Sequence, residues 1–409
     1  MSKRIIILAK YASSKQEGFE TRTFALARKF VKKGYKVDLF TSDSNHLAKF
    51  PAYKKLINMD NIDGINVYWI KTLKYNRTGS IRRVLSWFDF EIKFFVYCRK
   101  YILRPDVIIT SSLSPFSILN GVLLKSRFNN AKLICEIRDI WPLTLIEEGG
   151  YSKYHPFSIL LSIIEKFGYR KSDVVVGTMP NLKEHVYKLL KNKSLPVYCI
   201  PFGLEPNDYK LDPKSLKNNQ GLINLKAKLA GKFTIGYAGS IGLSNGLDSI
   251  INLIEKFNET NKEINFIFLG DGAYKEKYQK QLIHCDNVFF TGKIKREMVK
   301  YYLDLFDVLY FSSLPSKVWN YGWSLNKMTD YMMAGKPVLA SYSGHRSMIN
   351  EAKSGFFVES NNDEKLKKII LDISKMDKIQ LCEIGERGKR WIIKNRKWDD
   401  ISDNYIDIF

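Results

Sequence analysis

Short apolar runs alternate with longer segments of helical periodicity along the whole chain. In the first half, apolar runs predict strands at residues 4–10, 35–41, 107–110, 132–137, 173–178 and 197–200. Between them, apolar residues spaced three and four apart predict helices at residues 21–33, 81–104, 118–128, 157–169 and 182–191. Strands that alternate with helices in this way indicate a parallel sheet with crossover helices.

The second half repeats the pattern after a polar, lysine- and asparagine-rich linker at residues 206–231. Strands are predicted at residues 233–237, 264–269, 288–291, 308–312 and 338–340, and helices at 247–258, 297–306 and 327–334. We therefore predict an α/β protein of two doubly wound, Rossmann-like domains, residues 1–200 and 201–390, which face a central cleft. Residues 391–409 form a C-terminal segment that we expect to return to the first domain.

The composition fits a globular protein of two domains in a reducing compartment. A chain of 409 residues is too long for one core, and 45% of the residues are hydrophobic. No run of 18 uncharged apolar residues occurs, so no membrane-spanning helix is predicted. The five cysteines form no CxxC pair, which favours reduced thiols in a cytoplasm over a zinc site or a disulfide framework.

The positive charge is concentrated in the first half. Of the net charge of +23, residues 1–200 contribute +18, from 34 Lys and Arg against 16 Asp and Glu. Such an excess indicates an anionic partner, either a membrane surface or a nucleic acid. Because no helix-turn-helix, zinc-finger or RNP signature is present, we favour an anionic membrane surface and expect no nucleic acid.

Residues 81–104 form an unusually aromatic and basic segment, IRRVLSWFDFEIKFFVYCRKYILR. An amphipathic helix of this composition is typical of a lipid interface. A long helix that packs on the sheet and exposes its charges is equally consistent with the pattern. The sequence leaves both interpretations open.

Two polar groups stand where α/β proteins place their chemistry. In SLNKMTDYMMAGKPVLA, residues 324–340, we expect Asn326 to cap a short helix, with Lys327 and Asp330 one turn apart. The positive helix N-terminus with Lys327 suits an anion beside a hydroxylated sugar, although a plain surface helix would share the pattern. Arg138 and Asp139 follow a strand, which indicates either chemistry or a structural salt bridge.

Five motifs in a fixed order carry a family resemblance. They are EIRDIWP at residues 136–142, GYAGSIGLSNGLDSI at 236–250, LGDG at 269–272, VFFTGKI at 288–294 and NKMTDYMMAGKPVLA at 326–340. Together the motifs resemble family 4 of the retaining glycosyltransferases, the two-Rossmann-domain or GT-B type. The similarity is greatest to the branch that builds bacterial O-antigen and capsule repeat units.

The resemblance implies that a nucleotide diphosphate sugar, with a UDP-sugar favoured and an N-acetylated hexosamine as a candidate, binds mainly the second domain. It places the base near the backbone of Lys293 and Ile294, and the ribose hydroxyls on Asp330. The diphosphate would lie at the helix N-terminus and between glycine loops. The donor-binding residues implied are Gly18, Gly239, Ser240, Lys293, Ile294, Leu325, Asn326, Lys327 and Asp330.

The sequence departs from the family pattern at three places. Ser240 and Asn245 stand near positions where many members carry Arg and Lys, and Gly322 replaces the first of two motif glutamates. The Arg138-Asp139 pair replaces a histidine often found after the middle strand. Lys327, helix amides or Arg138 would then meet the diphosphate charge. The catalytic candidates are Lys327, Arg138 and Asp139, the last two as the pair that replaces the histidine. The mechanism implied lets the leaving diphosphate take the acceptor proton, with no metal and no cofactor.

The resulting expectation is a retaining glycosyltransferase that acts on a polyprenyl-diphosphate-linked glycan. It would work in the cytoplasm, peripherally on the inner face of the membrane. One alternative is a nucleotide-sugar 2-epimerase of the same architecture. The other is a non-catalytic basic protein that binds membranes or nucleic acid, which the basic half permits and the strand-end motifs oppose.

Overall fold

The computed structural model describes residues 2–18, 20–45, 48, 50, 53–75, 80–212, 219–257 and 263–409. The chain folds into two compact units. Unit 1 comprises Met1–Gly203 and Trp398–Phe409, and unit 2 comprises Leu204–Lys397. The predicted domain boundaries were at residues 200 and 390, compared with 203 and 397 in the structure.

Unit 1 is built on an eight-stranded sheet in the order β3-β4-β2-β1-β5-β6-β7-β8. The strands are β1 Arg4–Leu8, β2 Lys36–Ser42, β3 Ile57–Ile62, β4 Ile65–Ile70, β5 Val107–Ser111, β6 Lys132–Ile137, β7 Val174–Gly177 and β8 Val197–Cys199. All pairings are parallel except β3 with β4. Without β3, the order is that of a doubly wound sheet, with its switch point between β1 and β5.

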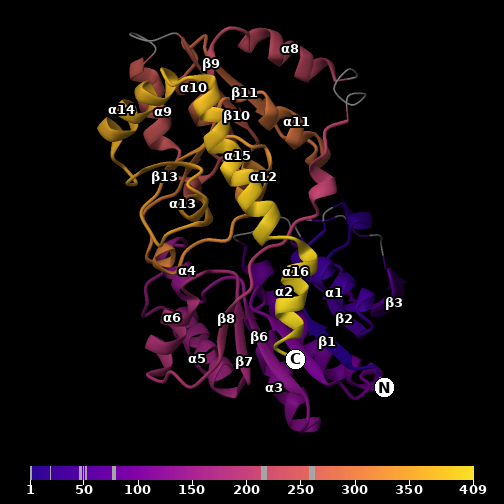
Figure 1. Ribbon diagram of the computed structural model, residues 1–409. Helices are drawn as coiled ribbons and strands as arrows, with labels where there is room; N and C mark the ends of the chain where they lie inside the picture. Colours follow the sequence, from indigo (N-terminus) through magenta and orange to yellow (C-terminus); the bar gives the residue numbers. More distant parts are fainter. Residues whose placement is uncertain are drawn as a thin grey trace. The chain divides into compact units, whose positions relative to one another are not determined.

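Helices cover both faces of this sheet (Figure 1). On one face α1 Arg22–Lys32 packs against α16 Trp398–Ile406, with the Phe30 and Tyr405 ring centroids 5.7 Å apart. On the other face α2 Ile81–Lys93 packs on α3 Ser117–Arg127 and α5 Pro156–Lys171, and Glu91 accepts a hydrogen bond from Asn120 at 2.7 Å. The short α4 Leu143–Glu147 and α6 Leu182–Leu190 complete the unit.

Unit 2 is built on a six-stranded, fully parallel sheet in the order β11-β10-β9-β12-β13-β14. The strands are β9 Phe233–Ala238, β10 Ile264–Leu269, β11 Val288–Gly292, β12 Val308–Ser312, β13 Val338–Ser341 and β14 Gly355–Val358. This too is a doubly wound order, and its switch point lies between β9 and β12. The predicted fold class, two α/β domains with parallel sheets, is confirmed.

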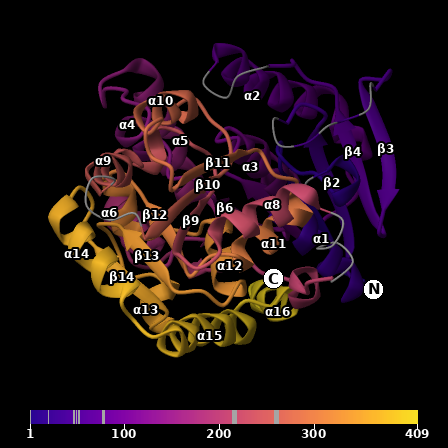
Figure 2. The same cartoon turned by 90° about the horizontal axis from the view of Figure 1, so that it is seen from above.

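Helices lie on both faces of this sheet (Figure 2), and an apolar cluster fills each face. One lies under α8 Gln220–Leu229, α11 Val299–Asp304, α12 Asn326–Met333, α13 Met348–Ala352 and α15 Lys378–Asn395. The other lies under α9 Asp248–Phe257, α10 Lys275–Gln281 and α14 Asp363–Ser374. Residue Asn258, the predicted end of the helix here assigned to α9, lies outside the described residues.

One prediction about chain organisation was wrong, and one element was not predicted. The predicted linker at residues 206–231 contains the 3-10 helix Pro206–Tyr209 and α8, whose buried Leu222, Leu225 and Leu229 belong to the core of unit 2; residues 213–218 lie outside the described part. The β3–β4 hairpin was missed altogether. Its turn at Asp63 and Gly64 has positive φ angles of 54° and 82°, and an Asp-Gly pair between apolar runs is the signal that predicts it.

Residues 81–104 do not form one helix. α2 ends at Lys93, and a π-helical turn at Phe94–Cys98 and a 3-10 turn at Arg99–Tyr101 follow. Trp87, Phe90 and Phe94 are buried, whereas Ile92 and Val96 are 61% and 56% exposed. The two interpretations of this segment therefore each describe one side of it, since the inner side is core and the outer side is an exposed apolar surface.

Candidate functional site

The carboxyl end of the unit 2 sheet opens between β9 and β12. These strands pair at Ile235–Val308 and Gly236–Leu309. Beyond that point the buried Tyr331 of α12 joins them, because its hydroxyl accepts from Ala238 N–H at 2.7 Å and donates to Tyr310 O at 3.1 Å. The opening is the topological switch point of the sheet, where α/β proteins bind their ligands.

Three glycine loops meet at this end of the sheet. Gly239 N–H donates to Leu269 O, and Gly270 N–H donates to Gly292 O, both at 2.9 Å. Gly270 has a φ of 137°, and a Cβ there would lie 1.9 Å from Gly239 O. The loops after β9, β10 and β11 therefore touch through their backbones, and a phosphate can approach such a layer closely.

Lys327, the second residue of α12, directs its amine to these loops. Nζ donates to Asn245 Oδ1 at 2.7 Å and to Tyr237 OH at 3.3 Å, and it lies 5.5 Å from the Phe311 ring centroid. A Cβ built on Gly239 would stand 3.1 Å from Nζ. Burial alone lowers the pKa of Lys327 to about 7. A bound anion would favour its charged form, because an opposite charge offsets the cost of burial.

The start of α12 differs by one residue from the prediction. Leu325 is the N-cap, with φ −94° and ψ 130°, and its carbonyl accepts from Met328 N–H at 3.0 Å. Asn326 is the first helical residue and is exposed, so its predicted capping role was wrong. Leu325 takes the cap position because its side chain packs on the apolar cluster under α12. The exposed Ser240 lies in the adjoining loop, and its carbonyl accepts from Tyr237 OH at 2.6 Å.

Asp330 is buried and holds three hydrogen bonds from within unit 2. Arg296 donates from both terminal nitrogens, one to each carboxylate oxygen, at 2.6 Å. Tyr209 OH donates to Oδ1 at 2.9 Å. Bidentate Arg–carboxylate pairs fix both partners. Asp330 is therefore a rigid acceptor with lone-pair capacity left for one further donor.

Lys293 and Ile294 follow β11 on the same loop as Arg296. Lys293 is exposed, and Ile294 is half-buried against the apolar cluster under α12. Since Arg296 binds Asp330, this loop and α12 are held together, which brings the predicted base-binding backbone near the predicted ribose-binding carboxylate. The structure thus joins Gly239, Lys327, Asp330 and this loop at one end of the sheet.

The remaining candidates lie in unit 1. Gly18 is exposed, has a φ of 93° and ends the 3-10 helix Lys15–Glu17, and no described atom lies within 4 Å of a Cβ built on it. A left-handed turn, rather than a close approach, explains this glycine. Arg138 does not pair with Asp139. Its guanidinium lies 3.9 Å from Glu136 and 4.6 Å from the Phe202 ring centroid.

Asp139 borders a small cavity of about 30 Å³ with a mainly apolar lining. Its backbone N–H donates to Ser112 Oγ at 3.3 Å, and burial raises the pKa of its carboxyl group. Burial and the charge of Asp139 raise the pKa of Glu148 to about 7. Residues of β5, β6, α3 and α5 complete the lining, among them Ser111, whose buried Oγ has no hydrogen-bond partner among the described residues. The cavity thus places the carboxyl group of Asp139 beside an apolar wall.

Glu136 occupies the centre of a buried charged cluster next to Arg138. Its Oε1 accepts from Arg22 Nε at 3.2 Å, and its Oε2 accepts from Tyr405 OH at 3.0 Å. Arg22 also donates to Pro201 O. This cluster joins α1, β6 and α16, so Arg138 belongs to a structural network as well as to the strand end.

The described part of the chain contains neither a candidate metal site nor a candidate membrane-spanning helix. No group of three or more His, Cys, Asp and Glu residues there could hold a metal ion. No helix there is long and apolar enough to cross a bilayer.

Comparisons with solved structures place the fold. Sucrose-phosphate synthase from Thermosynechococcus elongatus aligns with a TM-score of 0.70 at 16% identity, covering 99% of this chain and 98% of that one. HepE of Anabaena in complex with UDP and glucose gives 0.65 at 15%, with the same coverage. A trehalose-6-phosphate protein of E. coli bound with UDP-2-fluoro glucose gives 0.73 at 12%, again with the same coverage. These likenesses define the GT-B fold.

Two family models then identify the kind of protein. Residues 17–208 match the model described as Glycosyltransferase Family 4, and residues 223–398 match the model described as Glycosyl transferases group 1. The chain is thus a glycosyltransferase of the GT-B type, with a family 4 first part and a group 1 second part. No curated protein matched the sequence.

Sequence reasoning missed three of the residues that shape these sites. Arg296 and Tyr209 hold Asp330, yet Arg296 lies between the predicted strand 288–291 and helix 297–306, and Tyr209 lies in the predicted linker. Lys10, at the end of the first strand, was treated as part of that strand, although it is buried beyond the end of β1. A lysine directly after an apolar strand is the one signal that could have singled it out.

Proposed function

We propose that this protein is a retaining, metal-independent glycosyltransferase that moves a sugar from a UDP-sugar to a polyprenyl-diphosphate-linked glycan. In this proposal the donor binds unit 2, and the acceptor binds unit 1 at the inner face of a membrane. The transferred sugar is a hexose or an N-acetylated hexosamine.

The observation that carries the proposal is the position of the Lys327 amine. It is a partly buried cation at the switch point of the sheet, directed at glycine loops whose backbones a diphosphate can approach. The complexes of similar structures with UDP and UDP-2-fluoro glucose agree with a donor of this class. Asp330 would accept a ribose hydroxyl, and the Lys293 and Ile294 backbone would contact the base.

The chemistry follows from where charge develops. As the bond between sugar and diphosphate breaks, negative charge grows on the leaving diphosphate. Lys327 and the N-terminal amides of α12 are fixed in place and stabilise that charge without reorganisation. The diphosphate oxygen takes the proton of the acceptor hydroxyl on the same face of the sugar, so the anomeric configuration is retained. Asp139, at its cavity in unit 1, would orient the acceptor hydroxyl.

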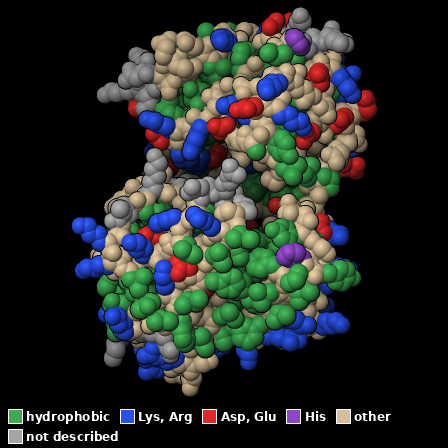
Figure 3. Space-filling model, turned by 180° about the vertical axis from the view of Figure 1, so that it is seen from behind, with side chains coloured by type: hydrophobic (Ala, Val, Ile, Leu, Met, Phe, Trp, Pro, Cys, Tyr) green, Lys and Arg blue, Asp and Glu red, His purple; other side chains and the backbone are tan. Residues whose placement is uncertain are grey.

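An exposed apolar surface on unit 1 supports a membrane-bound acceptor. Hydrophobic side chains gather over this unit, with Lys and Arg around them (Figure 3). We define the apolar face as the exposed residues of α2 with its π turn, α3 and α5: Ile81, Leu85, Phe88, Ile92, Phe95, Val96, Tyr97, Leu119, Leu123, Ile159, Leu160 and Ile163. An apolar surface on a unit with a large positive charge suits the interface of an anionic leaflet.

The test of the transfer reaction uses a panel of UDP-sugars. The sugar that most raises the melting temperature is incubated with a synthetic polyprenyl-diphosphate-linked sugar, and the product is analysed by NMR. Transfer with the donor's anomeric configuration supports the proposal. Inverted product contradicts retention, and formation of a 2-epimer without acceptor would identify an epimerase instead.

Co-sedimentation with anionic vesicles tests the membrane part separately. Ile92→Glu together with Ile163→Glu places two charges on the apolar face and should release the protein from vesicles. Ile283→Glu is the matched control, because Ile283 is 70% exposed in unit 2. Equal binding of both variants would contradict the assignment of this face.

A further inference from the structure

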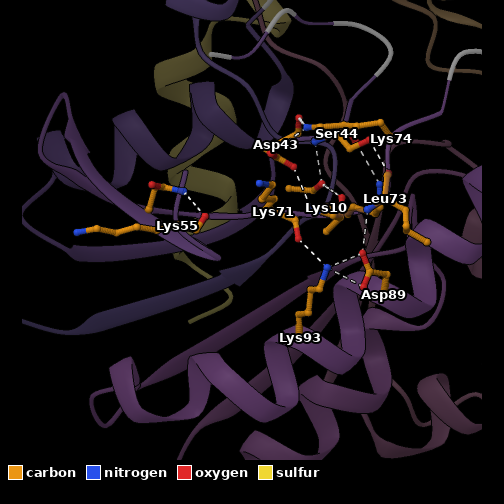
Figure 4. Close-up of polar contacts among 12 residues, drawn as sticks. Lys10, Asp43, Ser44, Lys55, Lys71, Leu73, Lys74, Asp89 and Lys93 are labelled. Carbon is orange, nitrogen blue, oxygen red and sulfur yellow. Dashed lines mark hydrogen bonds and ion pairs between the residues drawn. The ribbon is translucent and has the colours of Figure 1, made fainter. Parts of the chain in front are cut away.

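Lys10 in unit 1 occupies a position like that of Lys327 in unit 2, because each lysine lies at the switch point of its sheet. Lys10 follows β1 at the switch point of the unit 1 sheet, and its side chain is 1% exposed. Within the described part of the chain, its amine has one hydrogen-bond acceptor, Ser44 O at 3.2 Å (Figure 4). An ammonium group has three donors, and a buried charge is normally paired with an opposite one. Lys10 therefore lacks a counter-ion of its own.

The two carboxylates that act electrostatically on Lys10, Asp43 and Glu91, are engaged elsewhere. Asp43 binds Lys74 Nζ at 2.8 Å and accepts from Thr72 N–H at 3.0 Å. Glu91 accepts from Ser117 and from Asn120, the latter at 2.7 Å, and burial raises its pKa to about 7. These acids lower the cost of burying Lys10 without bonding to its amine, and the pKa of Lys10 is still lowered to about 7 by burial and by the charge of Arg83.

Other cations surround Lys10. Its Nζ lies 4.4 Å from the Tyr11 ring centroid, and the Arg83 guanidinium lies 5.6 Å from the same centroid. Tyr11 itself is held by hydrogen bonds from Arg83 Nε at 3.3 Å and Trp87 Nε1 at 2.7 Å. Lys74 is the third cation, at the end of the neighbouring β4 segment (Figure 4). Positive groups that converge on a strand end are typical of a site for a phosphate anion.

We propose that Lys10 and Arg83, with Lys74 beside them, form a binding site for a phosphate or diphosphate group. The site rests on the proposed function in one respect, since we assign it the diphosphate of the lipid-linked acceptor. A phosphate there would supply the counter-ion that the Lys10 amine lacks. Its oxygens would accept hydrogen bonds from the two remaining N–H groups of that amine. Arg83 would add a further charged hydrogen bond.

Calorimetry on the full chain, with inorganic pyrophosphate and farnesyl diphosphate as probes, tests the site. Saturating UDP is present so that the donor site in unit 2 is filled. Lys10→Met should weaken binding of both probes about tenfold or more, because a hydrogen bond between charged groups is lost. Lys55→Met is the matched control, since Lys55 is an exposed lysine of the same unit, and it should bind as the wild type does.

Arg83→Gln is the second variant and guards against a folding defect in Lys10→Met. It should also weaken both probes, with UDP affinity unchanged in both variants. Probe binding that survives in both variants at wild-type affinity would overturn the site. Binding of pyrophosphate without farnesyl diphosphate would overturn the assignment to a lipid-linked acceptor. UDP affinity is measured in parallel. If the wild-type protein does not bind UDP, that result contradicts the proposed donor and not the phosphate site at Lys10.

Discussion

The two sheets have the same doubly wound order, yet their carboxyl ends are built from different materials. In unit 2 the end is made of backbone, with glycine loops in mutual contact and one lysine directed at them. In unit 1 it is made of side chains, with aromatic rings, Arg83 and Lys74 around Lys10 and a carboxyl group at the Asp139 cavity. Both ends thus offer positive charge to a phosphate group, one through backbone N–H groups and a lysine, the other through side chains.

Buried charge should matter most to the stability of unit 1. Glu136→Gln leaves the buried Arg22 without its carboxylate partner, and breaking a buried pair in this way costs about 3–5 kcal/mol. Asp403→Asn removes the exposed partner of Lys33 and should cost less than about 1 kcal/mol. Urea unfolding of both variants measures the difference. Equal losses would show that the buried cluster does not organise unit 1.

Backbone contact should matter most to the end of the unit 2 sheet. Gly270→Ala adds a Cβ against Gly239 O and should destabilise unit 2 by about 2–4 kcal/mol. Gly231→Ala is the control, because Gly231 also has a positive φ, 83°, with no described atom within 4 Å of its Cβ position. It should cost about 1 kcal/mol. Similar midpoints in urea for the two variants would argue against contact between the loops.

We expect Asp330, and not the residues that hold it in place, to bind the ribose. Asp330→Ala should weaken UDP binding by about 1.5–3 kcal/mol, because a charged acceptor for a ribose hydroxyl is lost. Comparing UDP with 2′-deoxy-UDP sharpens the test. The wild type should prefer UDP, and that preference should shrink in Asp330→Ala but survive in Tyr209→Phe. A preference that persists in Asp330→Ala places the ribose elsewhere.

The pH dependence of donor binding follows from the pKa of Lys327, about 7 in the free protein. A bound diphosphate favours the charged amine, so UDP affinity should fall by up to about tenfold per pH unit above about pH 7.5. Stability does not fall with it. The folded pKa lies below the usual value of 10.5, so the unfolded chain binds more protons between the two values, and this lysine's contribution to stability rises with pH there. Lys327→Met should flatten the affinity profile measured by calorimetry.

Features that depend on local pattern could be predicted from the sequence. The strands, the glycine loops after β9, β10 and β11, and the short helix with Lys327 all follow from apolar periodicity and turn residues within a few positions. The Asn326 cap was missed by one residue, because the packing of Leu325 against a distant cluster decides where α12 begins.

Features that depend on long-range contact could not be predicted. Arg296 and Tyr209 meet Asp330 from positions 34 and 121 residues away, and no local pattern marks them. The partner of Arg138 is Glu136 rather than the adjacent Asp139, since β-strand geometry directs alternate side chains to the same face. Which side of α2 is buried likewise depends on its packing against α3 and α5, which are distant in the sequence.

The central claim is that the carboxyl end of the unit 2 sheet binds the donor diphosphate through Lys327. Turnover of the best-stabilising UDP-sugar by Lys327→Met tests it most directly, with Lys293→Met as the control, because Lys293 is exposed and only its backbone is assigned a contact. We predict that Lys327→Met lowers turnover by about 100- to 1,000-fold while UDP affinity falls less, since the charge on the leaving diphosphate grows in the transition state. Turnover and UDP affinity that both match the control would contradict the claim.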